Sequence, residues 1–321
     1  VEEADLTGDG SNNVLDASGF SGTVTLSGLG GDDTLWGAAG NDSLDGGDGT
    51  DLVAQSVDAD QVLNDSVLTG DGNDSISSIE RADLTGGASA NTINAAGFGR
   101  GPVTLAGAGG DDTLRGSPDD DVLEGGDGTD QIRQVRDADH VLTDTLVTGD
   151  GDDTLSSIEQ AQLTAGGSDN TLDASGFDAG PVTLDGAGGD DTLLGSASDD
   201  SLEGGPGTDQ LRQTVDADQV LTDSSLTGRG TDVVSSLEEA QLTGGATANT
   251  LDARAFSGTV TLTGLAADDT LWGAAGNDSL DGGGGDDLTR QEIDADQTLV
   301  DTLVTGDGDD TLTSVENGWL V

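Results

Sequence analysis

The chain has 321 residues and a formal net charge of −55 at pH 7, with 64 acidic residues, nine arginines, no lysine and no cysteine. This charge excludes nucleic acid and anionic membranes as direct partners, and the absence of cysteine excludes disulfides and thiolate sites. Hydrophobic residues make up only 32% and aromatic residues 2% of the chain, and 54 positions are glycine, so a conventional globular core cannot be filled and disorder is the first competing interpretation.

The residue types of the chain argue against a catalytic or membrane-spanning function. The single histidine, His140, cannot form a histidine-based zinc site or a catalytic triad. No apolar run approaches the roughly 20 residues that span a bilayer. We therefore expect no enzymatic activity and no membrane insertion, and we expect the chain to be an interior part of a longer protein.

A long repeat runs through the chain from its first residues. Leu6-Thr7-Gly8 returns as Leu84-Thr85-Gly86, and Phe20, Phe98, Phe177 and Phe256 follow one another at intervals of 78, 79 and 79 residues. The copies predicted from this period are residues 1–79, 80–158, 159–237 and 238–321, the last including the truncated start of a fifth copy. Because the pattern continues through the joints, we predict one continuous solenoid.

A nine-residue period lies inside each copy. From Gly28 the first copy reads GLGGDDTLW, GAAGNDSLD, GGDGTDLVA and QSVDADQVL, with Asp at each sixth place and an aliphatic residue at each eighth. A further nine, TGDGNDSIS, follows from Thr69 to Ser77. The sixth-place aspartates of the chain are Asp33, Asp42, Asp51, Asp60 and Asp74; Asp112, Asp121, Asp130, Asp139 and Asp153; Asp191, Asp200, Asp209, Asp218 and Asp232; and Asp269, Asp278, Asp287, Asp296 and Asp310.

Each nine is predicted to form a short strand and a tight turn. In Asp33-Thr34-Leu35-Trp36, alternation places Asp33 and Leu35 on the inner face and Thr34 and Trp36 on the outer face. The glycine-rich first half of each nine suits a sharp corner. Such a chain closes a flattened coil with two nines per turn, whose successive turns pair as parallel strands.

The motif GGxGxDxUx, in which U is a large aliphatic residue, resembles the calcium-binding nonapeptide of RTX (hemolysin-type) proteins. Residues 46–54, GGDGTDLVA, agree with it at every defined place. The fold class predicted is all-β, a right-handed parallel β-solenoid of the calcium-bound β-roll type. The alternative, because 78 or 79 is not a multiple of 18, is a three-sided parallel β-helix of about 26 residues per turn. If each turn instead has 18 residues, the surplus residues of each copy form bulges or short loops, one of them between Val62 and Ile76.

Stacked aspartates predict a calcium site. Parallel strands lie about 4.8 Å apart, so carboxylates on successive turns repel unless a cation lies between them, and Ca²⁺ accepts 6 to 8 oxygen ligands in loose geometry. The expected pairs are Asp33 with Asp51, Asp42 with Asp60, Asp112 with Asp130, Asp191 with Asp209, and Asp269 with Asp287. The resemblance implies that carbonyl oxygens of Gly28, Gly30, Asp32, Gly47 and Gly49 complete the shell.

We expect folding to depend on calcium, since the metal-free sequence has the composition of a disordered chain. The expected function is an extracellular or cell-surface structural region of a large secreted bacterial protein, acting as a spacer, adhesive stalk or surface-layer or filament building block. Binding to a cell-surface ligand or end-to-end self-association would accompany it. The alternative is the calcium-triggered secretion and folding module of an RTX toxin or secreted enzyme.

Several residues have simpler interpretations. Salt adaptation would scatter Asp and Glu, whereas here Asp recurs in phase. Asn13, Asn91, Asn170 and Asn249 are expected to be turn or ladder residues. Trp36 and Trp272 are expected to be scattered surface residues, with a sugar or partner contact as the lesser alternative. His140, which replaces Gln61 and Gln219 of other copies, is expected to be a surface substitution.

Overall fold

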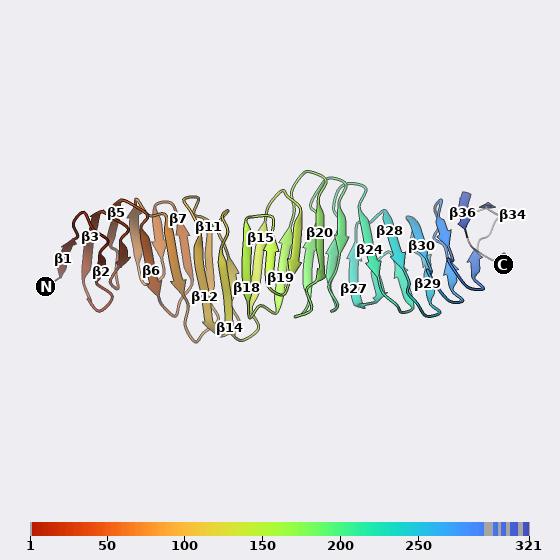
Figure 1. Cartoon of the computed structure of the whole chain (residues 1–321), viewed down its shortest axis with the longest axis horizontal. Helices are drawn as coiled ribbons and strands as arrows, with labels where there is room; N and C mark the ends of the chain where they lie inside the picture. Colours follow the sequence, from red (N-terminus) through yellow and green to blue (C-terminus); the bar gives the residue numbers. More distant parts are fainter. Residues whose placement is uncertain (1, 292–297, 301–302, 306–308, 314–316, 321) are drawn as a thin grey trace. The chain divides into compact units, whose positions relative to one another are not determined.

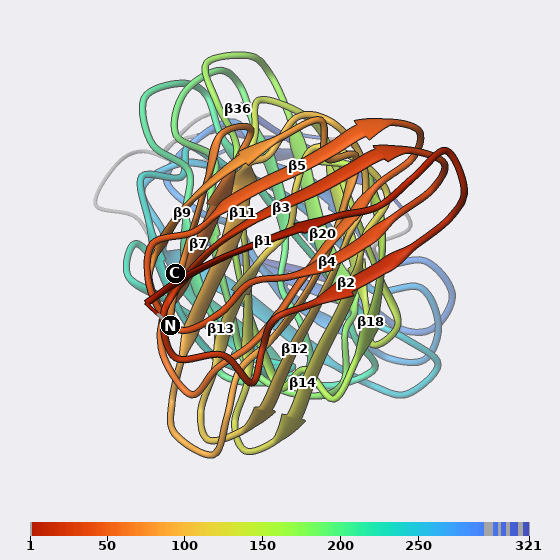
Figure 2. The same cartoon turned by 90° about the vertical axis from the view of Figure 1, so that its left-hand side faces the viewer.

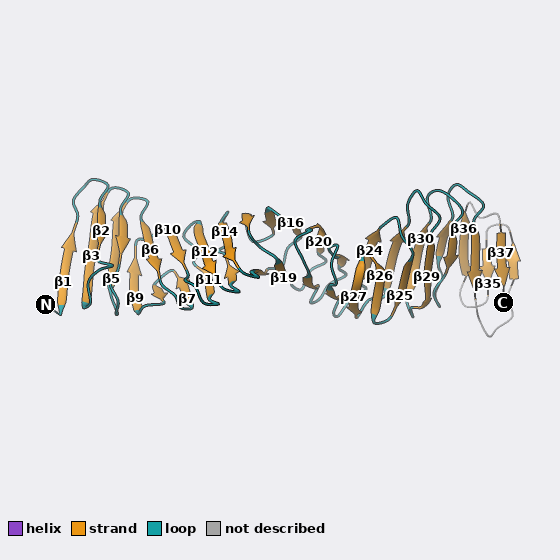
Figure 3. Ribbon diagram, turned by 90° about the horizontal axis from the view of Figure 1, so that it is seen from below, coloured by secondary structure: helices purple, strands orange, loops and turns teal. Residues whose placement is uncertain are grey.

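The computed structural model describes residues 2–291, 298–300, 303–305, 309–313 and 317–320. All regular elements in these ranges are β-strands, as the ribbon in Figure 3 shows. The described part contains no helix, and hence none of the length and apolarity that a membrane crossing requires. The all-β prediction is therefore confirmed for the residues that the structure describes.

The chain forms two compact units, residues 1–134 with 144–162 and residues 135–143 with 163–321. The strands of the first unit are β1 (Glu3–Thr7), β2 (Val14–Asp16), β3 (Thr23–Gly30), β4 (Thr34–Trp36), β5 (Ser43–Asp48), β6 (Leu52–Ser56), β7 (Gln61–Asn64), β8 (Val67–Thr69), β9 (Asn73–Ser77), β10 (Arg81–Thr85), β11 (Thr92–Gly97), β12 (Val103–Gly109), β13 (Thr113–Arg115), β14 (Val122–Asp127), β17 (Leu146–Thr148) and β18 (Asp152–Ser156).

The boundary between the units falls in β15 (Gln131–Val135) and β19 (Gln160–Thr164). The strands of the second unit are β16 (His140–Thr143), β20 (Thr171–Gly176), β21 (Val182–Asp185), β22 (Thr192–Leu194), β23 (Ser201–Glu203), β24 (Gln210–Thr214), β25 (Gln219–Thr222), β26 (Ser225–Gly228), β27 (Gly230–Ser235), β28 (Glu239–Thr243), β29 (Thr250–Ala255), β30 (Thr259–Thr263), β31 (Thr270–Trp272), β32 (Ser279–Asp281), β33 (Leu288–Gln291), β34 (Thr298–Val300), β35 (Leu303–Thr305), β36 (Asp309–Thr313) and β37 (Asn317–Leu320).

Consecutive strands alternate between two sheets, so the chain winds as a flattened coil. In the first unit β1, β3 and β5 pair in one sheet and β2, β4 and β6 in the other, all in parallel. Figure 1 shows these strands side by side, and Figure 2 shows the two layers from the end. The best-formed nines step 18 residues per turn, as between Asp33 and Asp51. A two-sheeted solenoid is confirmed, and the three-sided alternative is wrong.

The core is a thin row of aliphatic side chains between the two sheets. Leu26 and Leu44 face inward from β3 and β5, Leu35 and Val53 face inward from β4 and β6, and all four are fully buried. Thr34 lies on the opposite side of its strand, as predicted from the alternation. Each turn therefore packs only on its neighbours, which explains how a chain with few hydrophobic residues builds a core.

Each copy interrupts the coil with an antiparallel excursion. After β7, the chain doubles back through β8 to β9, and β9 pairs in parallel with β5. The next parallel partner of β7 is β11. The surplus residues between Val62 and Ile76 thus form a three-stranded meander within the sheet, where we expected a bulge or loop.

Glycine at the fourth place of a nine explains why β9, and not β7, lies next to β5. A Cβ at Gly72, in the nine that leads into β9, would collide with the carbonyl oxygen of Gly40 on the preceding turn. The nine that leads into β7 carries Asp58 at that place and cannot approach so closely. In the second and third copies, a Cβ at Gly151 or Gly230 would collide in the same way with the carbonyl oxygen of Asp119 or Ser198.

Two residues expected at the surface are buried. His140 has no exposed surface because it begins β16 on the inner side, where the equivalent Gln61 and Gln219 are also fully buried. Trp272 is only 8% exposed because the guanidinium groups of Arg254 and Arg290 cover its ring. Strand alternation placed Trp272 on the outer face correctly, but its neighbours exclude solvent from it.

Candidate metal centre

The sixth-place aspartates stand at the corners that lead into strands and are almost all buried. Asp33 immediately precedes β4 and Asp51 immediately precedes β6, with 1% and 0% of their surface exposed. The same burial holds for their equivalents in the other copies, Asp112, Asp130, Asp191, Asp209, Asp269 and Asp287. Sixteen described aspartates of the motif therefore lose hydration, which is costly for a carboxylate unless other groups replace the water.

Successive turns are joined by a ladder in which each carboxylate accepts a hydrogen bond from the backbone of the preceding turn. The Asp33 N–H donates to Asp51 Oδ1 at 2.7 Å. The same bond joins Asp112 to Asp130, Asp191 to Asp209 and Asp269 to Asp287 at 2.7–2.8 Å. The structure thus brings together these four predicted pairs, each on adjacent turns of the coil whose strands pair in the same sheet.

The predicted pair of Asp42 and Asp60 does not form. The Asp42 N–H donates to Asp74 Oδ1 at 2.9 Å, because β9 occupies the place beside β5. Asp121 is joined in the same way to Asp153, Asp200 to Asp232, and Asp278 to Asp310. Asp60, Asp139 and Asp218 are exposed and accept bonds from Thr92, Thr171 and Thr250. Asp296 lies outside the described residues.

Two ladder residues were missing from the predicted site. The Asn13 N–H donates to Asp33 Oδ1 at 2.7 Å, and the Asp51 N–H donates to Glu80 Oε2 at 3.0 Å. The ladder of the first copy therefore runs Asn–Asp–Asp–Glu, and Glu159 and Glu238 end the ladders of the second and third copies in the same way. The recurring Ile/Leu-Glu at the joints between copies was the available signal for the glutamates.

The two kinds of ladder differ at the second carboxylate oxygen. Asp42 Oδ2 accepts a hydrogen bond from the Ala38 N–H at 2.6 Å, and the Oδ2 atoms of Asp121, Asp200 and Asp278 are satisfied in the same way by the residue four places earlier. In the Asn–Asp–Asp–Glu ladders, by contrast, buried Oδ2 atoms have no hydrogen-bond partner; they belong to Asp33, Asp51, Asp112, Asp130, Asp191, Asp209 and Asp269.

Backbone carbonyls converge on these orphaned oxygens. A Cβ at Gly28 would collide with both Asp33 Oδ2 and the carbonyl oxygen of Gly46, and a Cβ at Gly46 would collide with the carbonyl oxygen of Ser78 and crowd Asp51 Oδ2. The first-place glycine therefore leaves room in which a carboxylate oxygen and a carbonyl oxygen approach one another. Oxygen donors of these two kinds are the ligands that Ca²⁺ takes.

The carbonyl ligands implied by the resemblance lie at the same corner. The carbonyl oxygen of Gly28 converges with Asn13 Oδ1 beside Gly8, one turn earlier. The Gly30 N–H donates to Asp9 O, and Asp32 Oδ1 accepts from the Thr50 N–H. Gly47 and Gly49 have φ of 103° and 152° and pack against the backbone of Leu29 and Gly31. Ligation by these atoms stays a prediction.

Burial also shifts the protonation of the ladder. Desolvation raises the pKa of Asp51, and the carboxylates of Asp33 and Glu80 add to this rise while the hydrogen bond from Asp33 opposes it. Desolvation likewise raises the pKa of Asp112, Asp130, Asp191, Asp209 and Asp269. A bound cation would reverse these shifts because it favours the ionised form.

Side chains alone do not complete a site. In the described ranges, no three His, Cys, Asp or Glu side chains converge in a way that could hold a metal ion. Each ladder position offers an orphaned carboxylate oxygen next to a main-chain carbonyl, so a cation held there would depend on both. This donor set fits a hard, oxygen-seeking ion such as Ca²⁺ and does not fit zinc.

A comparison with protein families agrees with this donor set. Six segments match the family model described as RTX calcium-binding nonapeptide repeat (4 copies): residues 18–53, 104–133, 143–157, 183–212, 261–288 and 299–314. The chain carries RTX calcium-binding nonapeptide repeats. No curated protein matches the sequence. The first RTX segment contains Asp33, Asp42 and Asp51, and Ca²⁺ is the ion that these repeats bind.

Proposed function

We propose that the chain is a calcium-dependent, extracellular structural region of a large secreted bacterial protein, serving as a spacer, adhesive stalk or surface-layer building block. The observation that carries this proposal is the recurrence of the same hydrogen-bonded pair of aspartates in all four copies. Each copy repeats the buried aspartates and the first-place glycine, and orphaned Oδ2 atoms occur in each. Repetition of one site along a chain serves length and stiffness, whereas catalysis requires one distinguished site.

Electrostatics supports a structural dependence on calcium. A chain of net charge −55 that buries aspartates on successive turns repels itself in the folded state. Ions bound between turns would remove repulsion only when the turns are stacked, so their binding free energy is folding free energy. Occurrence of RTX repeats in secreted bacterial proteins supports an extracellular setting, where calcium is abundant.

Single-molecule stretching tests the proposal. The full chain held between two handles is expected to resist extension in millimolar calcium and to extend as a flexible polymer in EGTA, with circular dichroism of the same samples reporting the β signal. Equal mechanical resistance with and without calcium would remove the calcium-dependent structural role. The alternative, a secretion and folding module, predicts instead that a neighbouring catalytic or pore-forming domain folds only when this region binds calcium.

A further inference from the structure

A cavity opens in the sheet of the first copy where a short strand leaves a gap. Strand β4 ends at Trp36, while its neighbour β6 continues to Ser56. The gap leads into a cavity of about 290 Å³ lined by Ser18, Trp36, Gln55, Asp71 and Asp74, among others. Its polar lining is acidic, and residues 1–79 contain no arginine.

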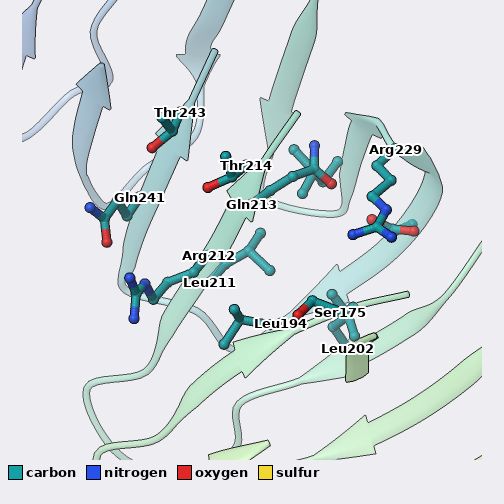
Figure 4. A pocket seen from close by; sticks show the side chains of 13 residues that line it. Ser175, Leu194, Leu202, Leu211, Arg212, Gln213, Thr214, Arg229, Gln241 and Thr243 are labelled. Atoms are coloured by element: carbon teal, nitrogen blue, oxygen red, sulfur yellow. The ribbon is translucent and has the colours of Figure 1, made fainter. Parts of the chain in front are cut away.

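The third copy has the same cavity with basic side chains in it. This cavity of about 310 Å³ is lined by Arg212 and Arg229, which Figure 4 shows on opposite sides of Gln213. In the repeat alignment Arg212 stands at the place of Ala54, and Arg229 at the place of Asp71. The Arg229 guanidinium lies 3.3 Å from Asp178. Desolvation raises the pKa of the buried Asp200, and the positive charge of Arg229 is one of the interactions that oppose this rise. In the third copy, arginine side chains of the chain itself therefore supply positive charge in the cavity.

In the fourth copy a guanidinium stacks on the tryptophan that is equivalent to Trp36. Arg254 lies 3.8 Å from the ring centroid of Trp272, which stands at the place of Trp36. Its Nε and Nη2 donate to the two carboxylate oxygens of Asp252 at 3.0 and 2.7 Å. Asp252 is directly opposite Trp272 in the parallel ladder. The fourth copy thus shows how this framework holds a guanidinium group.

The first copy has the same receiving groups without the guanidinium. Asp16 is directly opposite Trp36, as Asp252 is opposite Trp272. Asp16 Oδ1 accepts from the Ser18 N–H, as Asp252 Oδ1 accepts from the Arg254 N–H. The Ser18 hydroxyl also donates to Asp16 Oδ1 at 2.6 Å, where Arg254 Nε donates to Asp252 Oδ1. Ser18 is exposed and too short to cover the tryptophan.

The carboxylates of Asp71 and Asp74 add further negative charge to the cavity that Trp36 lines. Asp71 Oδ1 is buried without a hydrogen-bond partner, and Asp74 is only 2% exposed. In the third copy the corresponding charge is offset by Arg229, whereas the lining of the first-copy cavity contains no positive side chain. Arg81 stands outside this lining, in the neighbouring strand β10 opposite Leu52. The first-copy cavity is therefore complementary to a cation brought from outside.

We propose that the first-copy cavity is a binding site for a guanidinium group, namely an arginine side chain presented by a partner peptide. The guanidinium stacks on Trp36 and pairs with Asp16, in the arrangement that Arg254 adopts in the fourth copy, and the charges of Asp71 and Asp74 attract it. A planar guanidinium fits because it stacks on an aromatic face and binds a carboxylate with two parallel hydrogen bonds. A hydrated calcium ion lacks the planar face.

Isothermal titration calorimetry of the calcium-loaded chain with N-acetyl-L-arginine amide tests the site. We expect saturable binding at one site, and no comparable binding of the citrulline analogue, which has the same shape without the charge. The Ser18→Arg variant should abolish binding, because its own side chain then occupies the place that Arg254 takes. Trp36→Leu, which copies Leu194 of the third copy, should weaken binding about 2- to 5-fold.

The matched control is Ser175→Arg, the same change at the equivalent position of the third copy, where Leu194 replaces the tryptophan. This variant should bind the arginine probe as the parent does. The proposal is overturned if the probe shows no saturable binding, if the citrulline analogue binds equally well, or if Ser18→Arg and Ser175→Arg have the same effect. Circular dichroism in calcium confirms that each variant is folded before titration.

Discussion

The difference between the two ladders predicts that, of two similar substitutions, one destabilises the chain in a calcium-dependent way and the other does not depend on calcium. In Asp51→Asn, the amide oxygen can still accept the bond from the Asp33 N–H, but the charge and the orphaned Oδ2 are lost. In Asp42→Asn, both oxygens of the parent accept backbone bonds, from Val24 and from Ala38. In the Asp42→Asn variant, the new amide NH2 group would face one of these two backbone N–H donors at every calcium concentration.

The expected magnitudes follow from these contacts. Loss of one calcium site costs about 2.7 kcal/mol of unfolding free energy when calcium is at 100 times its Kd, and this cost grows by about 1.4 kcal/mol for each tenfold increase in calcium. Asp42→Asn is expected to cost about 1–3 kcal/mol through the unsatisfied buried groups. That cost should be the same at every calcium concentration, because no orphaned oxygen is removed.

Urea unfolding at three calcium concentrations, with bound ions counted by equilibrium dialysis, measures both effects. We expect Asp51→Asn to lower the number of bound ions and its destabilisation to increase with calcium. Asp42→Asn should leave the number unchanged and show a constant destabilisation. The assignment of calcium to the Asn–Asp–Asp–Glu ladders is refuted if the two variants share one calcium dependence, or if Asp42→Asn is the one that loses ions.

Three further predictions concern the corners and the buried acids. Gly46→Ala should destabilise the calcium-loaded chain by about 1–3 kcal/mol in urea unfolding, because its Cβ collides with Ser78 O. The control is Gly10→Ala, which should change the unfolding free energy by less than about 0.5 kcal/mol because no atom lies within 4 Å of its Cβ. Equal effects of the two substitutions would contradict the steric argument. Leu29→Gly should stabilise the chain by about 0.5–1 kcal/mol because Leu29 has a φ of 74°, while Leu6→Gly in ordinary extended backbone should destabilise it. Burial raises the pKa of Asp74 to about 6 and of Asp153 and Asp232 to about 7. The folded state then binds more protons than the unfolded state, so the metal-free chain should gain stability as pH falls from about 8 towards 4, on the order of 2 kcal/mol for Asp232 after allowance for solvent screening. Circular dichroism in EGTA measures this, and a β signal that declines steadily on acidification would contradict it.

Local pattern predicted the coil because its determinants repeat within nine residues. A glycine corner, an inward aspartate and an inward aliphatic residue each follow from positions in one nine, and parallel stacking of nines with the same pattern brings Asp33 next to Asp51. The acidic excess and the phase of the aspartates predicted a divalent cation for the same reason. The calcium-binding repeats found by comparison agree with that prediction.

The tertiary structure decided which turns become neighbours. Two nines competed for the place beside β5, and sequence spacing favoured the one with Asp60, yet the nine with Gly72 and Asp74 took it. Its glycine permits close stacking on Gly40, which no count of residues along the chain reveals.

Packing in the tertiary structure also buried His140 and divided the aspartates into two kinds. Which carboxylate oxygens are satisfied depends on backbone groups from other turns, and these meet only when the coil closes. The sequence by itself therefore determined the period, the corners and the chemistry of the ladder. Its strand partners and its orphaned oxygens were decided by packing between residues far apart in the chain.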